Sequence, residues 1–110
     1  MSSLETEMTV YIINNMTVHD RAQYETYLRA FMDVFRKFNG QVLVAQDAPN
    51  PLEGAWPYDR TVVLAFPSRE DALRWYGSPE YQAIVVHRFN GTTSNVVILD
   101  GLQAASHGRT

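Results

Sequence analysis

The chain contains no cysteine, no basic cluster and no long apolar run. Without cysteine it forms no disulfide, thiolate nucleophile or cysteine metal site. Its 9 Lys and Arg residues against 12 Asp and Glu residues give a formal net charge of -3. A nucleic-acid binder normally presents a basic face, so we expect no nucleic-acid partner.

Membrane and export signals are also missing. No apolar stretch approaches the roughly 20 residues that cross a bilayer. The first residues, 1–7, are polar and acidic and lack the basic start and apolar stretch of a signal peptide. We therefore predict a cytoplasmic protein without a membrane partner.

The composition is that of one globular domain. The 110 residues are 45% hydrophobic and 12% aromatic, which is typical of a chain with a packed core. We predict a domain over residues 9–102, with polar tails at 1–8 and 103–110.

The first half of the chain predicts a strand, a helix and a second strand. Residues 9–15 are β-branched and aromatic, as strands are. Asp20 predicts a helix N-cap, with Gln23 completing a capping box. Apolar residues then recur at helical spacing over 24–38, and Gly40 predicts the stop. The next apolar run, 41–46, predicts a strand.

The second half repeats this order with one interruption. Residues 60–66 predict a strand, and Ser68 predicts the N-cap of a second helix. That helix breaks at Gly77 and restarts at Ser78-Pro79, because proline is favoured at the first helical position. Residues 95–99 predict the last strand.

The resulting order, β-α-β-β-α-β, predicts an α+β ferredoxin-like fold. Its four-stranded antiparallel sheet would carry two helices on one face. Several strands are almost continuous apolar runs, which indicates burial on both faces of the sheet. A bare apolar face is rare in a soluble monomer, so we predict a homodimer, with a monomer that exposes apolar patches as the alternative.

Three blocks of sequence resemble the domain-of-unknown-function family 1330. They are residues 52–57, 60–68 and the Trp-Tyr-Gly-Ser-Pro-Glu-Tyr-Gln block at 75–82, followed by Arg88. The resemblance covers residues 9–101 and implies a dimeric α/β barrel. The family has no settled activity, and its superfamily is similar to cofactor-free monooxygenases, muconolactone isomerases and haem-dependent members. Asn39-Gly40 stands where many relatives have two glycines, and asparagine tolerates the left-handed conformation.

The connection from Asp47 to Asp59 is long for two adjacent antiparallel strands. It contains three prolines, which stiffen it, and the side chains of Leu52, Trp56 and Tyr58, which favour burial. We predict an ordered flap. The alternative is that Trp56 only fills a dimer interface.

Glu53 and Arg60 flank Trp56. Arg60 suits bidentate binding of a substrate carboxylate, and Glu53 is a candidate base. The alternative is a salt bridge that closes the loop.

Four aromatic residues are candidate pocket walls, namely Trp56 of the loop and Trp75, Tyr76 and Tyr81, which surround the helix break. Tyr24, on the inner face of the first helix, is a candidate to present its hydroxyl to the cavity. Packing in the core is the alternative for Tyr24 and for the three residues at the helix break.

His87 and Arg88 lie late in the second helix. His87 is a candidate acid or base near neutral pH, and Arg88 a candidate ligand contact that could instead cap the helix. The scattered histidines have no metal-ligand spacing, so we expect no metal site and no cofactor.

We therefore predict a homodimer that binds or transforms a small aromatic or carboxylated metabolite without a cofactor. Glu53 and His87 are the candidate catalytic residues. The candidate substrate-binding residues are Tyr24, Trp56, Arg60, Trp75, Tyr76, Tyr81 and Arg88. The alternatives are a non-catalytic ligand-binding or stress-associated dimer and a structural dimer without a ligand.

Overall fold

The computed structural model describes residues 8–102. The predicted tails, 1–8 and 103–110, lie outside the described residues except for Met8. In chain order the elements are β1 (Val10–Val18), α1 (Arg21–Phe35), the 3-10 helix η2 (Arg36–Phe38), β2 (Gln41–Asp47), β3 (Arg60–Phe66), α2 (Arg69–Tyr76), α3 (Pro79–Gly91) and β4 (Thr92–Asp100).

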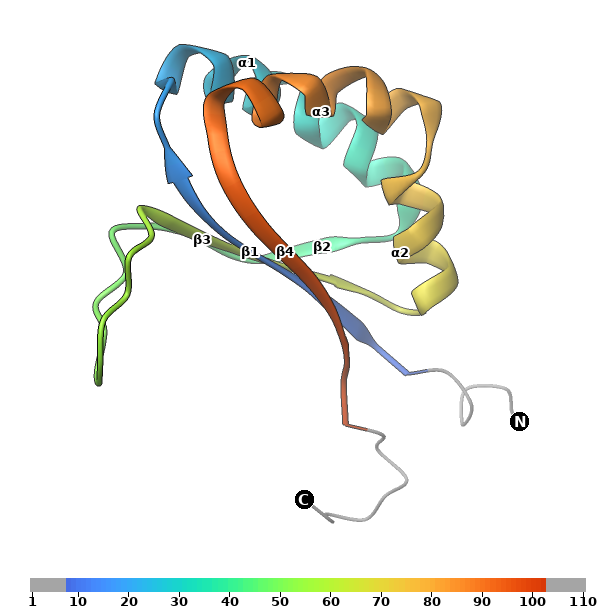
Figure 1. The fold of residues 1–110 in the computed structure, drawn as a ribbon. Coiled ribbons are helices and arrows are strands. Elements are labelled where there is room, and N and C mark those ends of the chain that lie inside the picture. Colours follow the sequence, from blue (N-terminus) through green and yellow to red (C-terminus); the bar gives the residue numbers. More distant parts are fainter. Residues whose placement is uncertain (1–7, 103–110) are drawn as a thin grey trace.

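The four strands form one antiparallel sheet in the order β2-β3-β1-β4, and α1, α2 and α3 lie together on one side of it (Figure 1). This is the predicted α+β, ferredoxin-like arrangement. The prediction of two helices on this face differs from the structure, which has three α-helices there. The second helical segment is two separate helices, α2 and α3, because the chain breaks at Gly77 and Ser78 caps a new start.

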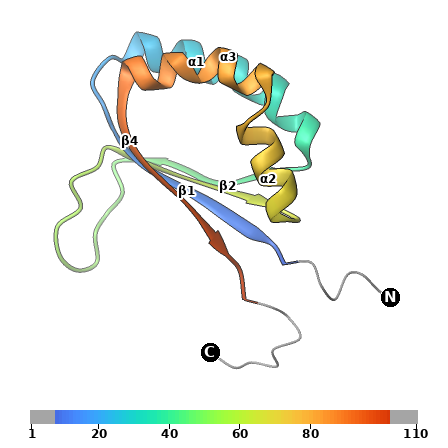
Figure 2. The same cartoon turned by 45° about the vertical axis from the view of Figure 1, so that its right-hand side comes forward.

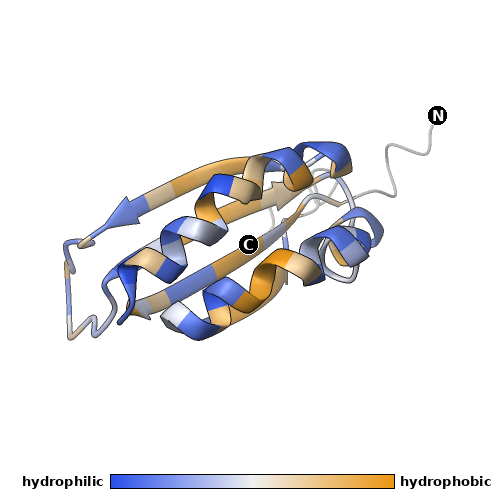
Figure 3. Ribbon diagram, turned by 90° about the horizontal axis from the view of Figure 1, so that it is seen from above, coloured by the Kyte–Doolittle hydropathy of each residue, from blue (hydrophilic) through white to orange (hydrophobic). Residues whose placement is uncertain are grey.

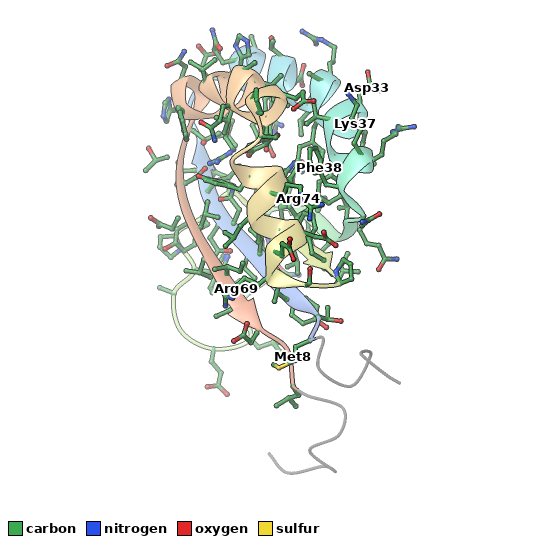
Figure 4. All side chains as sticks on the ribbon, turned by 90° about the vertical axis from the view of Figure 1, so that its right-hand side faces the viewer. Met8, Asp33, Lys37, Phe38, Arg69 and Arg74 are labelled. Atoms are coloured by element: carbon green, nitrogen blue, oxygen red, sulfur yellow. The ribbon has the colours of Figure 1, made fainter. Side chains whose placement is uncertain are left out.

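Helix α1 begins as predicted but with only half of the capping box. The Asp20 carboxylate accepts a hydrogen bond from the Gln23 backbone N–H at 3.2 Å. The Gln23 side chain does not reach back, because Asp20 N–H donates instead to the Gly91 carbonyl. Figure 4 shows Asp33 and Lys37 pointing outward, so the polar side of this helical segment faces away from the sheet.

Two residues with special backbone or space requirements, Asn39 and Gly40, follow η2. Asn39 takes the left-handed conformation with φ 69°, as predicted for the position before Gly40. A Cβ on Gly40 would lie 2.4 Å from the Phe35 ring and 2.8 Å from the Phe66 ring. Glycine is therefore required here by space.

Serine caps start both of the later helices. The Ser68 hydroxyl accepts from Asp71 N–H, and the Ser78 hydroxyl accepts from Tyr81 N–H, each at 3.1 Å. Ser78 also donates to the Trp75 carbonyl at 2.9 Å, so one side chain fixes the backbones that carry Trp75 and Tyr81. No helix among residues 8–102 is long and apolar enough to cross a membrane.

The core lies between the helices and one face of the sheet. Along β1 the side chains of Val10, Ile12 and Met16 are buried on this face, at every second position. Phe35 and Trp75 meet edge to face with ring centroids 5.5 Å apart. Figure 3 shows the hydrophobic stretches of the strands beneath the helices.

The other face of the sheet, here called the open face, carries no helix of the described chain (Figure 2). The register places Val44, Val63, Val97 and Leu99 on it. Val97 is 51% exposed and Leu99 47% exposed. Apolar side chains on the two sheet faces explain why the strands read as continuous apolar runs.

Candidate functional site

A cavity of about 120 Å³ lies between the sheet and the helices. Much of its wall is aromatic, with Tyr24 and Tyr27 from α1, Trp75 and Tyr76 from α2, and Tyr81 from α3. Concave, mostly apolar spaces with a few polar groups are the usual form of small-molecule sites. The polar groups of this cavity therefore decide what it can hold.

Three buried polar atoms have no hydrogen-bond partner within residues 8–102, and all three belong to residues that line the cavity. They are Asn14 Oδ1, Trp75 Nε1 and Arg88 Nε. Buried polar groups are nearly always paired, because an unpaired one costs about 1–3 kcal/mol. Because the residues that carry them line one cavity, this cavity is a candidate site for a polar partner.

Arg88 is the unusual charge of this site. It is only 3% exposed, and its guanidinium carbon lies 5.8 Å from the Tyr27 ring centroid and 5.3 Å from that of Phe89. Burial disfavours its charged form, but the Tyr81 and Tyr27 hydroxyls outweigh burial and raise the pKa of Arg88. The side chain therefore stays cationic.

Tyr27 and Tyr81 join their hydroxyls beside Arg88, with the two oxygens 2.7 Å apart. Burial raises the pKa of Tyr27 well above its ordinary value, and the neighbouring Tyr81 raises it further. Burial also raises the pKa of Tyr81, although the Arg88 guanidinium opposes this. Both phenols therefore keep their protons at neutral pH and act as hydrogen-bond groups.

Arg60 lines the same cavity but is already paired. Its Nη1 lies 2.9 Å from Asp47 Oδ1, and its Nε donates to the Tyr24 hydroxyl at 2.9 Å. Burial lowers the pKa of Arg60, but the hydrogen bond that Arg60 donates to Asp47 and the nearby Tyr24 hydroxyl outweigh burial and raise it. The ion pair at the base of the loop thus forms with Asp47, and Glu53 is not its partner.

The connection between β2 and β3, here called the hairpin loop (residues 48–59), extends away from the sheet (Figures 1 and 2). The expected burial of its apolar side chains is wrong for the single chain, since Leu52 is 99% exposed and Trp56 43% exposed. Glu53 and Trp56 line a separate hollow beside Val44, on the open face. Neither of them lines the cavity.

His87 also lies apart from the cavity. Its Nδ1 is 2.9 Å from Gln23 Oε1, so it joins α3 to α1. It does not line the cavity or the hollows beside it. The structure thus brings six predicted site residues to the cavity wall, namely Tyr24, Arg60, Trp75, Tyr76, Tyr81 and Arg88, while Glu53, Trp56 and His87 lie elsewhere.

Shallower hollows adjoin the cavity on the side of β4. Tyr76 and Val96 line the cavity and both of these hollows, and Val96 is partly exposed. A small molecule entering between the helices and β4 would therefore pass the Tyr76 ring.

Sequence reasoning missed Asn14 and Tyr27 as site residues. A signal for Asn14 was present, because it follows Val10 and Ile12 at a spacing of two and so belongs to the apolar face of β1. A polar residue at a core position is the informative exception. Tyr27 carried no signal beyond its place in the apolar stripe of α1.

No group of three or more His, Asp or Glu side chains placed to hold a metal ion occurs in the described part of the chain. The cavity wall, as described, also contains no Asp, Glu or His. Its titratable groups are tyrosines and arginines. The site therefore offers hydrogen bonds and positive charge, and its own wall supplies no base that titrates near neutral pH.

The sheet order, the helical layer and the cavity between them define the class of the protein as a ferredoxin-like α+β domain. Residues 9–102 match the family described as Domain of unknown function (DUF1330). The chain belongs to this family. No curated protein matches it.

Solved structures support the same fold. The RPA0582 protein of unknown function from Rhodopseudomonas palustris shares 20% identity and a TM-score of 0.73, over 87% of this chain and 84% of that one. SnoaB, a cofactor-independent oxygenase from Streptomyces nogalater, shares 15% identity and a TM-score of 0.63, over 88% and 96%. A dimeric ferredoxin-like protein of unknown function from Thermobifida fusca shares 14% identity and a TM-score of 0.61, over 86% and 92%. At these identities the likeness concerns the fold alone.

Proposed function

We propose that this protein is a homodimer that binds a small organic molecule in the cavity of each protomer, without a cofactor. The observation that carries the proposal is that Asn14, Trp75 and Arg88, each with an unpartnered buried polar atom, line the same cavity. A structural protein would gain stability by pairing or removing such groups. A binding protein keeps them for its ligand.

The dimer rests on the open face. Val44, Val97 and Leu99 expose apolar surface there, and Trp56 of the hairpin loop lies at its edge. A second copy placed against this face would bury these side chains, as a two-fold interface does. The related Thermobifida fusca structure is described as dimeric, which supports the same arrangement here.

Binding is favoured over catalysis by the chemistry of the cavity wall. Proton transfer near neutral pH is usually carried out by His, Asp or Glu, and the wall of the cavity contains none of these among the described residues. The catalytic roles of Glu53 and His87 stay predictions. Oxygenation, the activity named for SnoaB, is the alternative chemistry for this chain.

The first experiment is native mass spectrometry of the untagged protein, purified gently from its own host. We expect a dimer mass with one small adduct per protomer, and fragmentation of the adduct gives its chemical class. Arg88→Met should lose the adduct, while Arg36→Met, an exposed charge change on η2, should keep it. A monomer would contradict the dimer, and adducts that survive Arg88→Met would contradict the cavity as the site.

Once the adduct is identified, a turnover assay distinguishes a binding protein from an enzyme. An enzyme would convert the molecule, and Glu53→Gln or His87→Gln would lower the rate while leaving affinity intact. A binding protein returns the molecule unchanged in wild type and in both variants.

A further inference from the structure

Arg88 and Arg60 face the same cavity in different electrostatic states. Arg60 has the Asp47 carboxylate at 2.9 Å. Arg88 has no carboxylate within ion-pair distance among the described residues, although it is the more deeply buried of the two. A buried charge is normally paired, because leaving water without a partner is costly. The missing partner of Arg88 is therefore an anion that the chain itself does not supply.

The groups around Arg88 suit a carboxylate. Its guanidinium presents planar, parallel N–H donors, which match the two oxygens of a carboxylate. Trp75 adds an N–H without a partner, and that indole group can only donate. The Tyr27 and Tyr81 hydroxyls hold two protons, and the bond between them uses one. One phenolic proton therefore remains to donate to the ligand.

Asn14 requires a hydrogen-bond donor on the same ligand. Its Oδ1 is an acceptor without a partner, placed at the middle of the central strand β1. A carboxylate oxygen beside it would leave it unsatisfied, so the ligand needs an O–H or N–H at this point. An ammonium group would add positive charge to a cavity that already contains Arg60 and Arg88. A hydroxyl group satisfies Asn14 without that repulsion.

The size of the cavity limits the ligand. Its volume is about 120 Å³. An engineered protein cavity of about 150 Å³ accommodates benzene, a molecule of about six non-hydrogen atoms. The ligand is therefore of that size or smaller, unless the Tyr76 side of the cavity opens.

We propose that the ligand is a small hydroxycarboxylate of about the size of lactate. Its carboxylate would lie against Arg88 and the Trp75 indole N–H, and its hydroxyl would donate to Asn14. This inference rests on the proposed function, since it names the ligand class of the same cavity.

Four matched probes test each part of this inference. Lactate carries both groups, propionate lacks the hydroxyl, lactamide lacks the charge and alanine replaces the hydroxyl with an ammonium group. Each is titrated into ¹⁵N-labelled protein while the side-chain N–H signals of the two tryptophans are followed. Trp75 lies in the cavity and Trp56 on the hairpin loop, so the second signal is an internal control.

We expect lactate to shift the Trp75 signal saturably and to leave the Trp56 signal in place. Propionate should bind more weakly than lactate. Lactamide and alanine should bind about tenfold more weakly than lactate or worse. Lactamide loses the charged hydrogen bond to Arg88, and the ammonium group of alanine is repelled by the two arginines. Arg88→Met should abolish the lactate response, and Arg36→Met should retain it. Circular dichroism of Arg88→Met shows whether the variant is folded, and the wild-type titrations need no variant.

Several outcomes would overturn the inference. Equal binding of lactamide and lactate would mean that the cavity does not recognise the negative charge of the ligand. This result would leave the proposed small-molecule site intact. Propionate binding as tightly as lactate would remove the role of Asn14. No response to any probe would overturn the hydroxycarboxylate assignment, while the native-mass adduct would still decide the proposed function separately.

Discussion

Replacing Arg88 should make the ligand-free protein more stable. Arg88 is 3% exposed, and its Nε has no partner within the described residues. Methionine follows the same unbranched course but is shorter, and it carries no charge. We therefore predict that Arg88→Met raises the free energy of unfolding, which is the opposite of the usual effect of a core substitution.

The expected size follows from two opposing contributions. Burial of an unpaired ion costs several kcal/mol even after the surroundings relax. The cation–π contacts with Tyr27 at 5.8 Å and Phe89 at 5.3 Å return about 1–2 kcal/mol each. The Tyr27 and Tyr81 hydroxyls, which raise the pKa of Arg88, offset part of the remainder, so the net gain is about 1 kcal/mol. Since about 1 kcal/mol moves the melting temperature of a small domain by about 4–8 °C, the shift is easily measured.

The assay is thermal and urea unfolding of protein refolded from denaturant, so that no ligand is carried through the purification. Wild type and variants are compared at equal concentration, because the proposed dimerisation would make the melting temperature concentration-dependent. Arg36→Met should stay within about 0.5 kcal/mol of wild type. If Arg88→Met lowers the stability instead, Arg88 is a structural anchor and the argument for an external anion fails.

Three further predictions concern the turn, the open face and the buried phenols. Gly40→Ala should lose about 1–3 kcal/mol of stability in urea unfolding, because its Cβ would meet a phenylalanine ring at 2.4 Å. Val97→Asp should convert the proposed dimer to a monomer in analytical ultracentrifugation, whereas Val86→Asp, at an exposed position on α3, should not. Tyr27→Phe should cost about 1–2 kcal/mol by removing the 2.7 Å hydrogen bond to Tyr81. It should also weaken the loss of stability in alkali, measured by unfolding across pH.

The sign of the alkaline effect follows from the raised pKa values of Tyr27 and Tyr81. The unfolded chain releases phenolic protons at about pH 10, while the folded chain still holds them. The folded state then binds more protons than the unfolded state, so stability falls as pH rises above about 10. If the free energy of unfolding falls equally steeply with pH in wild type and in Tyr27→Phe, this assignment is wrong.

A Val97→Asp variant that remains dimeric would place the interface elsewhere. A Gly40→Ala variant as stable as wild type would mean that the aromatic rings move aside.

Local signals in the sequence predicted the elements well. Ser78-Pro79 marked the restart of a helix, and Ser78 caps it as expected. Asn39 was expected to tolerate the left-handed conformation and does adopt it. Each of these depends on neighbours within a few residues, and the residue types alone carry that information.

Expectations that depended on distant partners were less accurate. Gln23 fits a capping box by spacing, but it bonds to His87. A salt bridge between Arg60 and Glu53 was one alternative, but strand register places Asp47 opposite Arg60. Leu52 was expected to be buried, yet nothing in the single chain covers it. Hydrogen-bond competition and register act across the fold and leave no local pattern.

Periodicity and capping are short-range effects, so the order of elements, the helix caps and the two-faced apolar sheet could be predicted from the amino-acid sequence. Which polar atoms remain unpaired depends on the tertiary structure. Asn14, Trp75 and Arg88 lie on three different elements, and each is ordinary in its own segment. They become a site because the fold encloses them together around one cavity and supplies no partner from the rest of the described chain.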